Sequence, residues 1–224
     1  MSRPKKIDCF EGMSNVVFNT HAKRGVVCYS LGRGEKASTR IVIVDIESGK
    51  LLCNEKKAGK FTVLALHNDG ERIVVQDSSD TKVKGLLNTM RFDGKGLQTI
   101  DIWEPYGEKD NREIVRVELI GEDKLMTCND AGNVVVWNFD TREPLMRFDI
   151  PRTTRPKVSP DQCYIAFCGG NRVGFVDIEK QRAAASKAAP GMRSWFKFSF
   201  HPSGKFFAAS AHRPLTIWCT ADGR

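Results

Sequence analysis

Few residues in this sequence have the types and spacing that catalysis requires. The four histidines, His21, His67, His201 and His212, lie in polar stretches typical of turns and strand ends, outside any recognisable serine or cysteine nucleophile motif. The nucleophile-elbow pattern Gly-x-Ser-x-Gly does not occur in the chain. These patterns argue against a hydrolytic triad, and we expect that the chain is not an enzyme and has no small-molecule substrate.

The cysteines and the glycine-rich loop also lack the spacing of a ligand site. The chain has 7 cysteines, with no Cys-x-x-Cys pair and no zinc-type pairing with histidines. We therefore expect reduced thiols packed as small apolar side chains, which favours a reducing compartment such as the cytoplasm. The loop 31–39, LGRGEKAST, contains no Walker or dinucleotide pattern. We expect no metal and no cofactor.

Composition and charge limit the class of protein. The chain of 224 residues is 41% hydrophobic, which is enough for one substantial globular body. It has no apolar run approaching the length of a membrane span, and its basic start lacks the apolar segment of a secretory signal. We therefore expect no membrane association. A net charge of +8 favours acidic partners and says nothing about the fold.

The elements that would position any site are short strands. The stretch 125–149 predicts three of them, Met126–Cys128, Val134–Trp137 and Leu145–Phe148, joined by tight turns at 130–133 and 140–143. Gly and Asn tolerate positive φ and Asp bonds back to nearby amides, so both junctions turn the chain at little cost. Because an isolated ribbon of this kind is marginal in water, it must pack on further copies.

The rest of the chain supplies those copies. Five segments share an apolar, β-rich run that reaches Trp or Val and is followed by a polar turn, at positions Val44, Trp103, Trp137, Val176 and Trp218. Upstream of each segment, a polar turn precedes another apolar strand. A period near 40 residues with several strands per repeat is typical of a β-propeller blade. We therefore expect an all-β fold, a propeller of about five four-stranded blades.

On these residues the chain resembles the WD40-repeat family, with divergent repeats. The resemblance is carried by the strands ending in Val-Trp-Asn and Ile-Trp and by four turns, Asn68-Asp69-Gly70, Asp130-x-Gly132, Ser159-Pro160-Asp161 and His201-Pro202-Ser203-Gly204-Lys205. No Gly-His dipeptide occurs, so the buried Asp–His–Ser/Thr–Trp network of the family cannot be complete in any blade. We expect the blades to be held together mainly by apolar packing between neighbouring sheets.

We expect a single propeller domain over residues 1–224, with blades at about 11–57, 58–110, 111–150, 151–189 and 190–224. Residues 5–10 stand where a closing outer strand belongs. Three alternatives stay open: a closed five-blade ring, an incomplete ring that is part of a longer seven-blade protein, and a ring shared with other chains. In the second blade we place the third strand at 98–104, after an insert at about 77–97 that is either functional or a solvated hairpin.

The resemblance also implies a binding face. In WD40 propellers, the loops between blades share one face with the loops between the second and third strands, and here those loops carry most of the excess positive charge. The candidate partner-binding residues are Lys56, Lys57, Lys60, Arg152, Arg155, Lys157, Arg193 and, as an aromatic beside them, Trp195. A basic face speeds encounter with acidic proteins or nucleic acid. A basic surface that only aids solubility is the alternative.

The fold and this face favour a non-catalytic, cytoplasmic scaffold that binds one or more protein partners, which we expect to be acidic. The alternative is a nucleic-acid- or ribosome-associated propeller similar to those of translation factors. Both readings use the same basic loops, and the alternative also needs exposed aromatic side chains for base stacking. Because many functions share one fold, the fold by itself does not choose between them.

Overall fold

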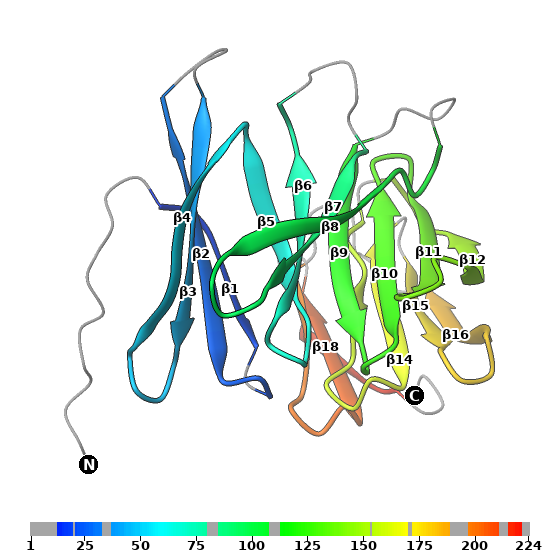
Figure 1. Ribbon diagram of the computed structural model, residues 1–224. Coiled ribbons are helices and arrows are strands. Elements are labelled where there is room, and N and C mark those ends of the chain that lie inside the picture. The colour runs from blue at the N-terminus through cyan, green and yellow to red at the C-terminus, as the bar shows by residue number, and fades with distance from the viewer. Residues whose placement is uncertain are drawn as a thin grey trace. The chain divides into compact units, whose positions relative to one another are not determined.

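The computed structural model describes residues 13–19, 21–32, 37–79, 85–107, 113–152, 154–169, 172–188, 197–210 and 215–220. Throughout these residues the protein has strands in five antiparallel sheets and no helix, which confirms the predicted all-β class (Figure 1). The chain divides into two compact units, Met1–Glu113 and Ile114–Arg224. We describe each unit by itself.

The first unit contains two four-stranded sheets, each with its strands in chain order. Sheet A consists of β1 (Met13–Asn19), β2 (Arg24–Leu31), β3 (Ser38–Asp45) and β4 (Leu51–Ala58). Sheet B consists of β5 (Phe61–Leu66), β6 (Arg72–Asp77), β7 (Leu87–Phe92) and β8 (Leu97–Trp103). The predicted closing strand at 5–10 lies outside the described residues.

The second unit contains three sheets. Sheet C consists of β9 (Ile114–Ile120), β10 (Lys124–Asn129), β11 (Asn133–Asn138) and β12 (Pro144–Asp149). Sheet D consists of β13 (Lys157–Val158), β14 (Tyr164–Gly169), β15 (Arg172–Asp177) and β16 (Arg182–Ala188). Sheet E has three described strands, β17 (Lys197–Phe200), β18 (Phe206–Ser210) and β19 (Leu215–Cys219). Figure 1 shows β9, β10 and β11 side by side, as their pairing requires.

All five sheets follow one plan, which a recurring backbone hydrogen bond makes visible. A residue just beyond or at the end of the third strand donates its amide to a carbonyl in the turn between the first and second strands. The five bonds are Ile46 N to Lys23 O (2.9 Å), Phe92 N to Glu71 O (2.9 Å), Phe139 N to Asp123 O (2.6 Å), Ile178 N to Cys163 O (3.0 Å) and Thr220 N to Lys205 O (3.0 Å). The sheets are therefore repeats in three dimensions as well as in sequence.

Two residues before each of these donors lies the key position of the repeat. It pairs with the second residue of the second strand in every sheet. The pairs are Val44 with Gly25, Met90 with Ile73, Trp137 with Leu125, Val176 with Ile165, and Trp218 with Phe207. All five key side chains are buried. Four of them are the residues that the sequence pattern predicts.

The second sheet is where the predicted strands are wrong. The third strand is β7, inside the supposed insert, and the segment predicted as the third strand is the fourth, β8. Met90, 1% exposed, therefore occupies the key position, and Trp103 ends the outer strand, only half-buried. With Met90 rather than Trp103 as the key residue, the key positions of successive sheets recur roughly every 39 to 47 residues, which is a more even repeat than Trp103 would give.

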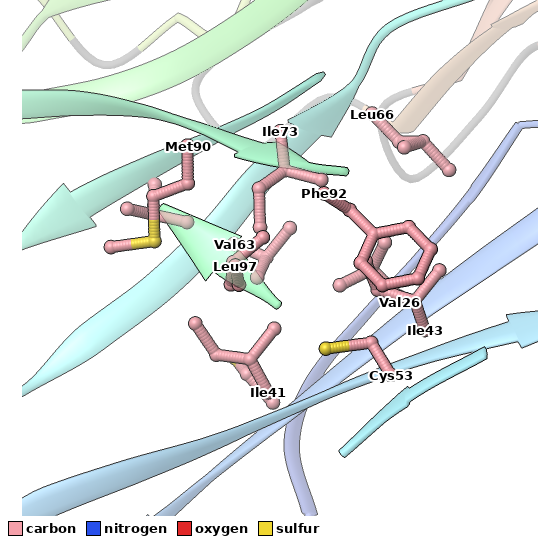
Figure 2. Close-up of a cluster of buried hydrophobic side chains, with 12 residues drawn as sticks. Val26, Ile41, Ile43, Cys53, Val63, Leu66, Ile73, Met90, Phe92 and Leu97 are labelled. Atoms are coloured by element: carbon pink, nitrogen blue, oxygen red, sulfur yellow. The ribbon is translucent and has the colours of Figure 1, made fainter. Parts of the chain in front are cut away.

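Apolar packing joins sheets A and B, as Figure 2 shows. Side chains from both sheets form one buried cluster, labelled there as Val26, Ile41, Ile43, Cys53, Val63, Leu66, Ile73, Met90, Phe92 and Leu97. Polar contacts accompany this packing; for example, the Thr39 hydroxyl donates to Gly59 O at 3.0 Å and accepts from Phe61 N at 2.9 Å. Burial of this apolar surface is the main source of stability for the pair of sheets.

The second unit is packed in the same way. One cluster joins sheets C and D around Met126, Val136 and Ile165, and another joins sheets D and E around Phe175 and Phe207. The buried Trp137 indole also donates to the Thr127 hydroxyl at 2.9 Å. This bond ties the third strand of sheet C to its second strand.

Each unit has two distinct ends. At one, called here the connector end, the chain passes from one sheet to the next and the second and third strands are joined. Gly59 N bonds to Ala37 O (3.0 Å) there in the first unit, and Ile150 N bonds to Gly132 O (2.8 Å) in the second. The other end, called the turn end, carries the remaining turns. Within each unit, the two kinds of loop that the resemblance groups together do meet.

Candidate functional site

The connector end of the first unit exposes one of the predicted basic residues. Lys60 lies between β4 and β5 with its side chain in solvent. Its backbone is held on both sides, because Ser78 N donates to Lys60 O at 2.8 Å and Lys60 N donates to Ser79 Oγ at 2.9 Å. The charge is therefore presented from a fixed backbone position.

Lys56 and Lys57 are not in a loop as predicted, because β4 continues to Ala58. Lys57 also bonds to a neighbouring sheet: its ammonium donates to Leu97 O and forms an ion pair with Glu55 at 3.0 Å. Glu55 in turn accepts from Leu97 N at 2.7 Å. Lys57 thus bridges the outer strands of sheets A and B, whereas the Lys56 side chain is exposed on β4.

The connector end of the second unit exposes two predicted residues, Arg152 and Arg155, on the connection between β12 and β13. This connection is held against sheet C by the bond from Ile150 N to Gly132 O. It also lies against sheet D, since a side chain at Gly169 would meet Thr154 Oγ1 at 2.2 Å. Two cations therefore project from a short segment clamped between two sheets.

Three other predicted residues contribute differently. Lys157 belongs to β13, where its ammonium donates to Phe198 O at 3.2 Å and lies 5.3 Å from the centre of the Phe198 ring. It therefore joins sheets D and E more than it faces solvent. Arg193 and Trp195 lie outside the described residues, so their place in a site stays a prediction.

Sequence reasoning missed a charged pair beside this connection. Arg116 and Glu118 lie in β9 and form an ion pair with each other. The second oxygen of Glu118 accepts a hydrogen bond from Val158 N of β13 at 2.7 Å. Alternating apolar and charged residues in 114–119 predict a strand. The strand that Glu118 contacts, β13, lies about 40 residues further along the chain, so the sequence gives no sign of this contact.

Acidic side chains are also present at this end of the second unit. Asp130 and Asp149 are exposed there, and Asp149 accepts a hydrogen bond from the Asn133 side chain at 2.8 Å. Asp149 is thereby tied to the turn between β10 and β11. Arg152 and Arg155 are exposed on the clamped connection itself, where they can meet an anion from solvent.

The described histidines, His21, His67 and His201, lie in turns or directly after strands, and His212 lies outside the described residues. The imidazole of buried His67 lies 2.9 Å from the Asp69 carboxylate, which also bonds to the Arg72 guanidinium at 2.6 Å. Partial burial raises the pKa of Asp69, but hydrogen bonds from the Arg72 and Glu71 amides and from the Arg72 side chain outweigh it and lower that pKa to about 2. This cluster fixes the turn before β6 at the turn end, and His201 with Ser203 forms a similar turn before β18.

Four of the described cysteines pack as apolar side chains, as expected, whereas Cys163 is exposed in a turn and Cys219 is half-buried. Cys28, Cys53, Cys128 and Cys168 are buried, and burial raises the pKa of the Cys128 and Cys168 thiols to about 12. Such thiols are poor nucleophiles at neutral pH. Within the described ranges, no group of three or more metal-ligating side chains comes together. Across the same ranges, no helix is long and apolar enough to cross a membrane.

Comparison with known proteins adds no family and no activity to these features. The candidate site consists of the basic side chains at the connector ends of the two units. The Arg116–Glu118 pair lies beside the connector end of the second unit. The chain matches no protein-family model, and no curated protein matches it significantly.

Proposed function

We propose that this protein is a non-catalytic binding platform that holds an acidic protein segment at its connector end. The observation that supports this most directly is the connection between β12 and β13. It carries the exposed Arg152 and Arg155 and is clamped by sheets C and D. A cation on a clamped backbone binds an anion with a smaller loss of conformational entropy than one on a free loop.

The charge of the whole chain supports the same kind of partner. A net charge of +8 draws acidic proteins by long-range attraction and repels basic ones. Local acids such as Asp149 limit where a partner can sit, because like charges placed opposite each other are unfavourable. Sheets built from apolar cores and structural turns supply a rigid support for such a partner.

We further propose that the five sheets are the blades of one β-propeller. Sheet E exposes Phe206, Leu215 and Ile217 on one face, sheet A exposes Phe18 and Leu51, and sheet B exposes Ile100 and Ile102 on its outer strand. Exposed apolar side chains gathered on a sheet face indicate a face that another element covers. In a propeller, each blade covers its neighbour in this way, so both end sheets are suited to packing against a further sheet.

The size of the pure chain in solution tests this architecture. If the ring closes within one chain, small-angle scattering should give a monomer with a radius of gyration of about 17 Å, the value for a compact domain of this length. Light scattering measures the mass on the same sample. A stable dimer, or a monomer with a much larger radius, would contradict closure within a single chain.

Charge reversal tests the binding function. We expect the double variant Arg152→Glu with Arg155→Glu to bind a labelled polyglutamate peptide at least about tenfold more weakly than the wild type, because two attractive contacts become repulsive. Fluorescence anisotropy at low and physiological salt measures this. Lys205→Glu is the matched control, since Lys205 is exposed in a turn at the opposite end of the same unit.

The same assay separates this proposal from nucleic-acid binding. Single-stranded RNA serves as the second probe, and its affinity should fall steeply with salt if phosphate contacts dominate. Polyglutamate binding that responds to the double variant but not to the control supports the platform. Tighter binding of RNA, lost in the same variant, would favour the nucleic-acid alternative instead.

A further inference from the structure

A half-buried guanidinium lies beside the exposed arginines of the second unit. The Arg116 side chain is 38% exposed, and its ion-pair partner Glu118 is 19% exposed. Glu118 is itself fixed, because Val158 N of the neighbouring sheet donates to its other oxygen at 2.7 Å. The carboxylate therefore holds the Arg116 guanidinium at the junction of sheets C and D.

Arg116 is incompletely satisfied by this one carboxylate. Its Nε–H is buried and has no hydrogen-bond partner among the residues that the structure describes. Burial lowers the pKa of Arg116, and the charge of Arg155 lowers it further. Val158, three positions after Arg155, donates its amide to Glu118, so the connection that carries Arg155 lies beside the strand that carries Arg116. An additional anion between them would relieve both the repulsion and the cost of burial.

A second incompletely satisfied group adjoins Arg155. Thr154, only 3% exposed, precedes Arg155 in the chain. Its Oγ1 hydroxyl is buried and finds no hydrogen-bond partner within the described part of the chain. Buried polar groups are normally paired, and an unpaired one calls for a specific explanation such as a ligand or ion. This hydroxyl faces Gly169 of sheet D, so, within the residues described, the connection that carries Arg155 holds an unpaired polar group of its own.

We propose that Arg116 and Arg155 together bind a single carboxylate of the acidic partner, with Glu118 as the positioning residue for Arg116. This rests on the proposed function and names the group that the platform recognises. Guanidinium groups bind carboxylates through short, charge-assisted hydrogen bonds, often two at a time. An Asp or Glu side chain, or a C-terminal carboxylate, supplies the required group.

The charge of the site favours a carboxylate over a phosphate. Two guanidinium groups and one carboxylate leave a single positive charge, which one further carboxylate neutralises. A phosphate monoester carries a charge of about −1.5 to −2 at neutral pH. It would leave net negative charge next to Glu118, so the site should prefer the singly charged group.

If Arg116 and Arg155 bind one carboxylate, the charge of Arg155 destabilises the free protein and stabilises the complex with the partner. We expect Arg155→Gln to raise the melting temperature of the free chain at low salt by about a few degrees, because it removes the repulsion on Arg116. The same variant should bind a tetraglutamate peptide about tenfold more weakly. A residue with only a structural role would not move these two quantities in opposite directions.

The experiment uses the full chain, with tetraglutamate and inorganic phosphate as separate probes in calorimetric titrations. Arg116→Gln should also weaken tetraglutamate binding about tenfold, and Lys205→Gln, at the turn end, is the control. If Arg116→Gln does not fold, Arg155→Gln decides the matter alone, since Arg155 is exposed.

Each result leads to a different conclusion. Equal tetraglutamate affinity in the wild type and Arg155→Gln overturns this site while leaving the binding platform in place. Tighter binding of phosphate than of tetraglutamate overturns the preference for a carboxylate. If the wild type binds no acidic peptide at all, the proposed function fails along with the site.

Discussion

Replacing Phe207 by Ala should destabilise the second unit by about 3–5 kcal/mol, the usual cost of removing a fully buried phenylalanine. Phe207 is 0% exposed and lies at the centre of the cluster that joins sheets D and E. Its ring is 5.2 Å from the Phe175 ring in an edge-on arrangement and 5.1 Å from the Phe200 ring, also edge-on. Such geometry adds to the energy of burial.

Urea denaturation followed by tryptophan fluorescence measures this loss, since Trp218 lies in the same cluster. Phe207→Leu is the matched control: it keeps an apolar side chain at the site and should cost only about 1–1.5 kcal/mol. A cost for Phe207→Ala no larger than that of the control would mean that sheets D and E do not pack through this residue. The expected loss is a large part of the stability of an ordinary domain.

The repeat could be predicted because its signal is local. Val44, Trp137, Val176 and Trp218 each end an apolar run before a polar turn, and the structure buries all four at equivalent positions. Period-two alternation and turn residues report on the immediate backbone, which is also what determines where a short strand lies. The alanine-rich segment Arg182–Ala188 forms the strand β16 although alanine favours helices, so its place beside β15 outweighs its intrinsic propensity.

The second sheet shows how the same signal misleads. Its third strand, LNTMRF, contains the buried polar residues Asn88 and Thr89, so it reads as part of a polar insert. Trp103 at the end of the next strand imitates the key residue of the repeat. Only the hydrogen-bonded pairing of β6 with β7 shows that Met90 holds that position. Tertiary packing has here outweighed the local pattern.

The binding residues were harder to predict than the strands for a related reason. A basic residue can be assigned to a loop from the sequence, yet Lys56 and Lys57 lie in β4 because that strand runs longer than its apolar part. Arg116 was missed because its significance depends on Arg155 and on Glu118 reaching Val158 in another sheet. Such contacts join residues about 40 positions apart, where the pattern of a single strand carries no information.

The connector end depends on a close backbone approach at Gly132, and this makes Gly132→Ala the other substitution with a large expected effect. Gly132 has a φ of 93°, and a Cβ there would lie 2.1 Å from Ile150 O. The left-handed backbone costs a residue with a Cβ about 1–2 kcal/mol. The overlap with the carbonyl must be relieved by moving backbone, which raises the total to about 3 kcal/mol or more.

Gly121→Ala in the same unit separates these two contributions. Gly121 also has a positive φ, 64°, but a Cβ there would meet its nearest neighbour at an ordinary 3.6 Å. We expect this control to cost only about 1 kcal/mol in urea denaturation. Because the Gly132 carbonyl holds the connection that carries Arg152 and Arg155, Gly132→Ala should also weaken tetraglutamate binding under conditions where it remains folded. Equal costs for the two variants would show that the connection is not held against the β10–β11 turn, and the clamped presentation of both arginines would then have no structural basis.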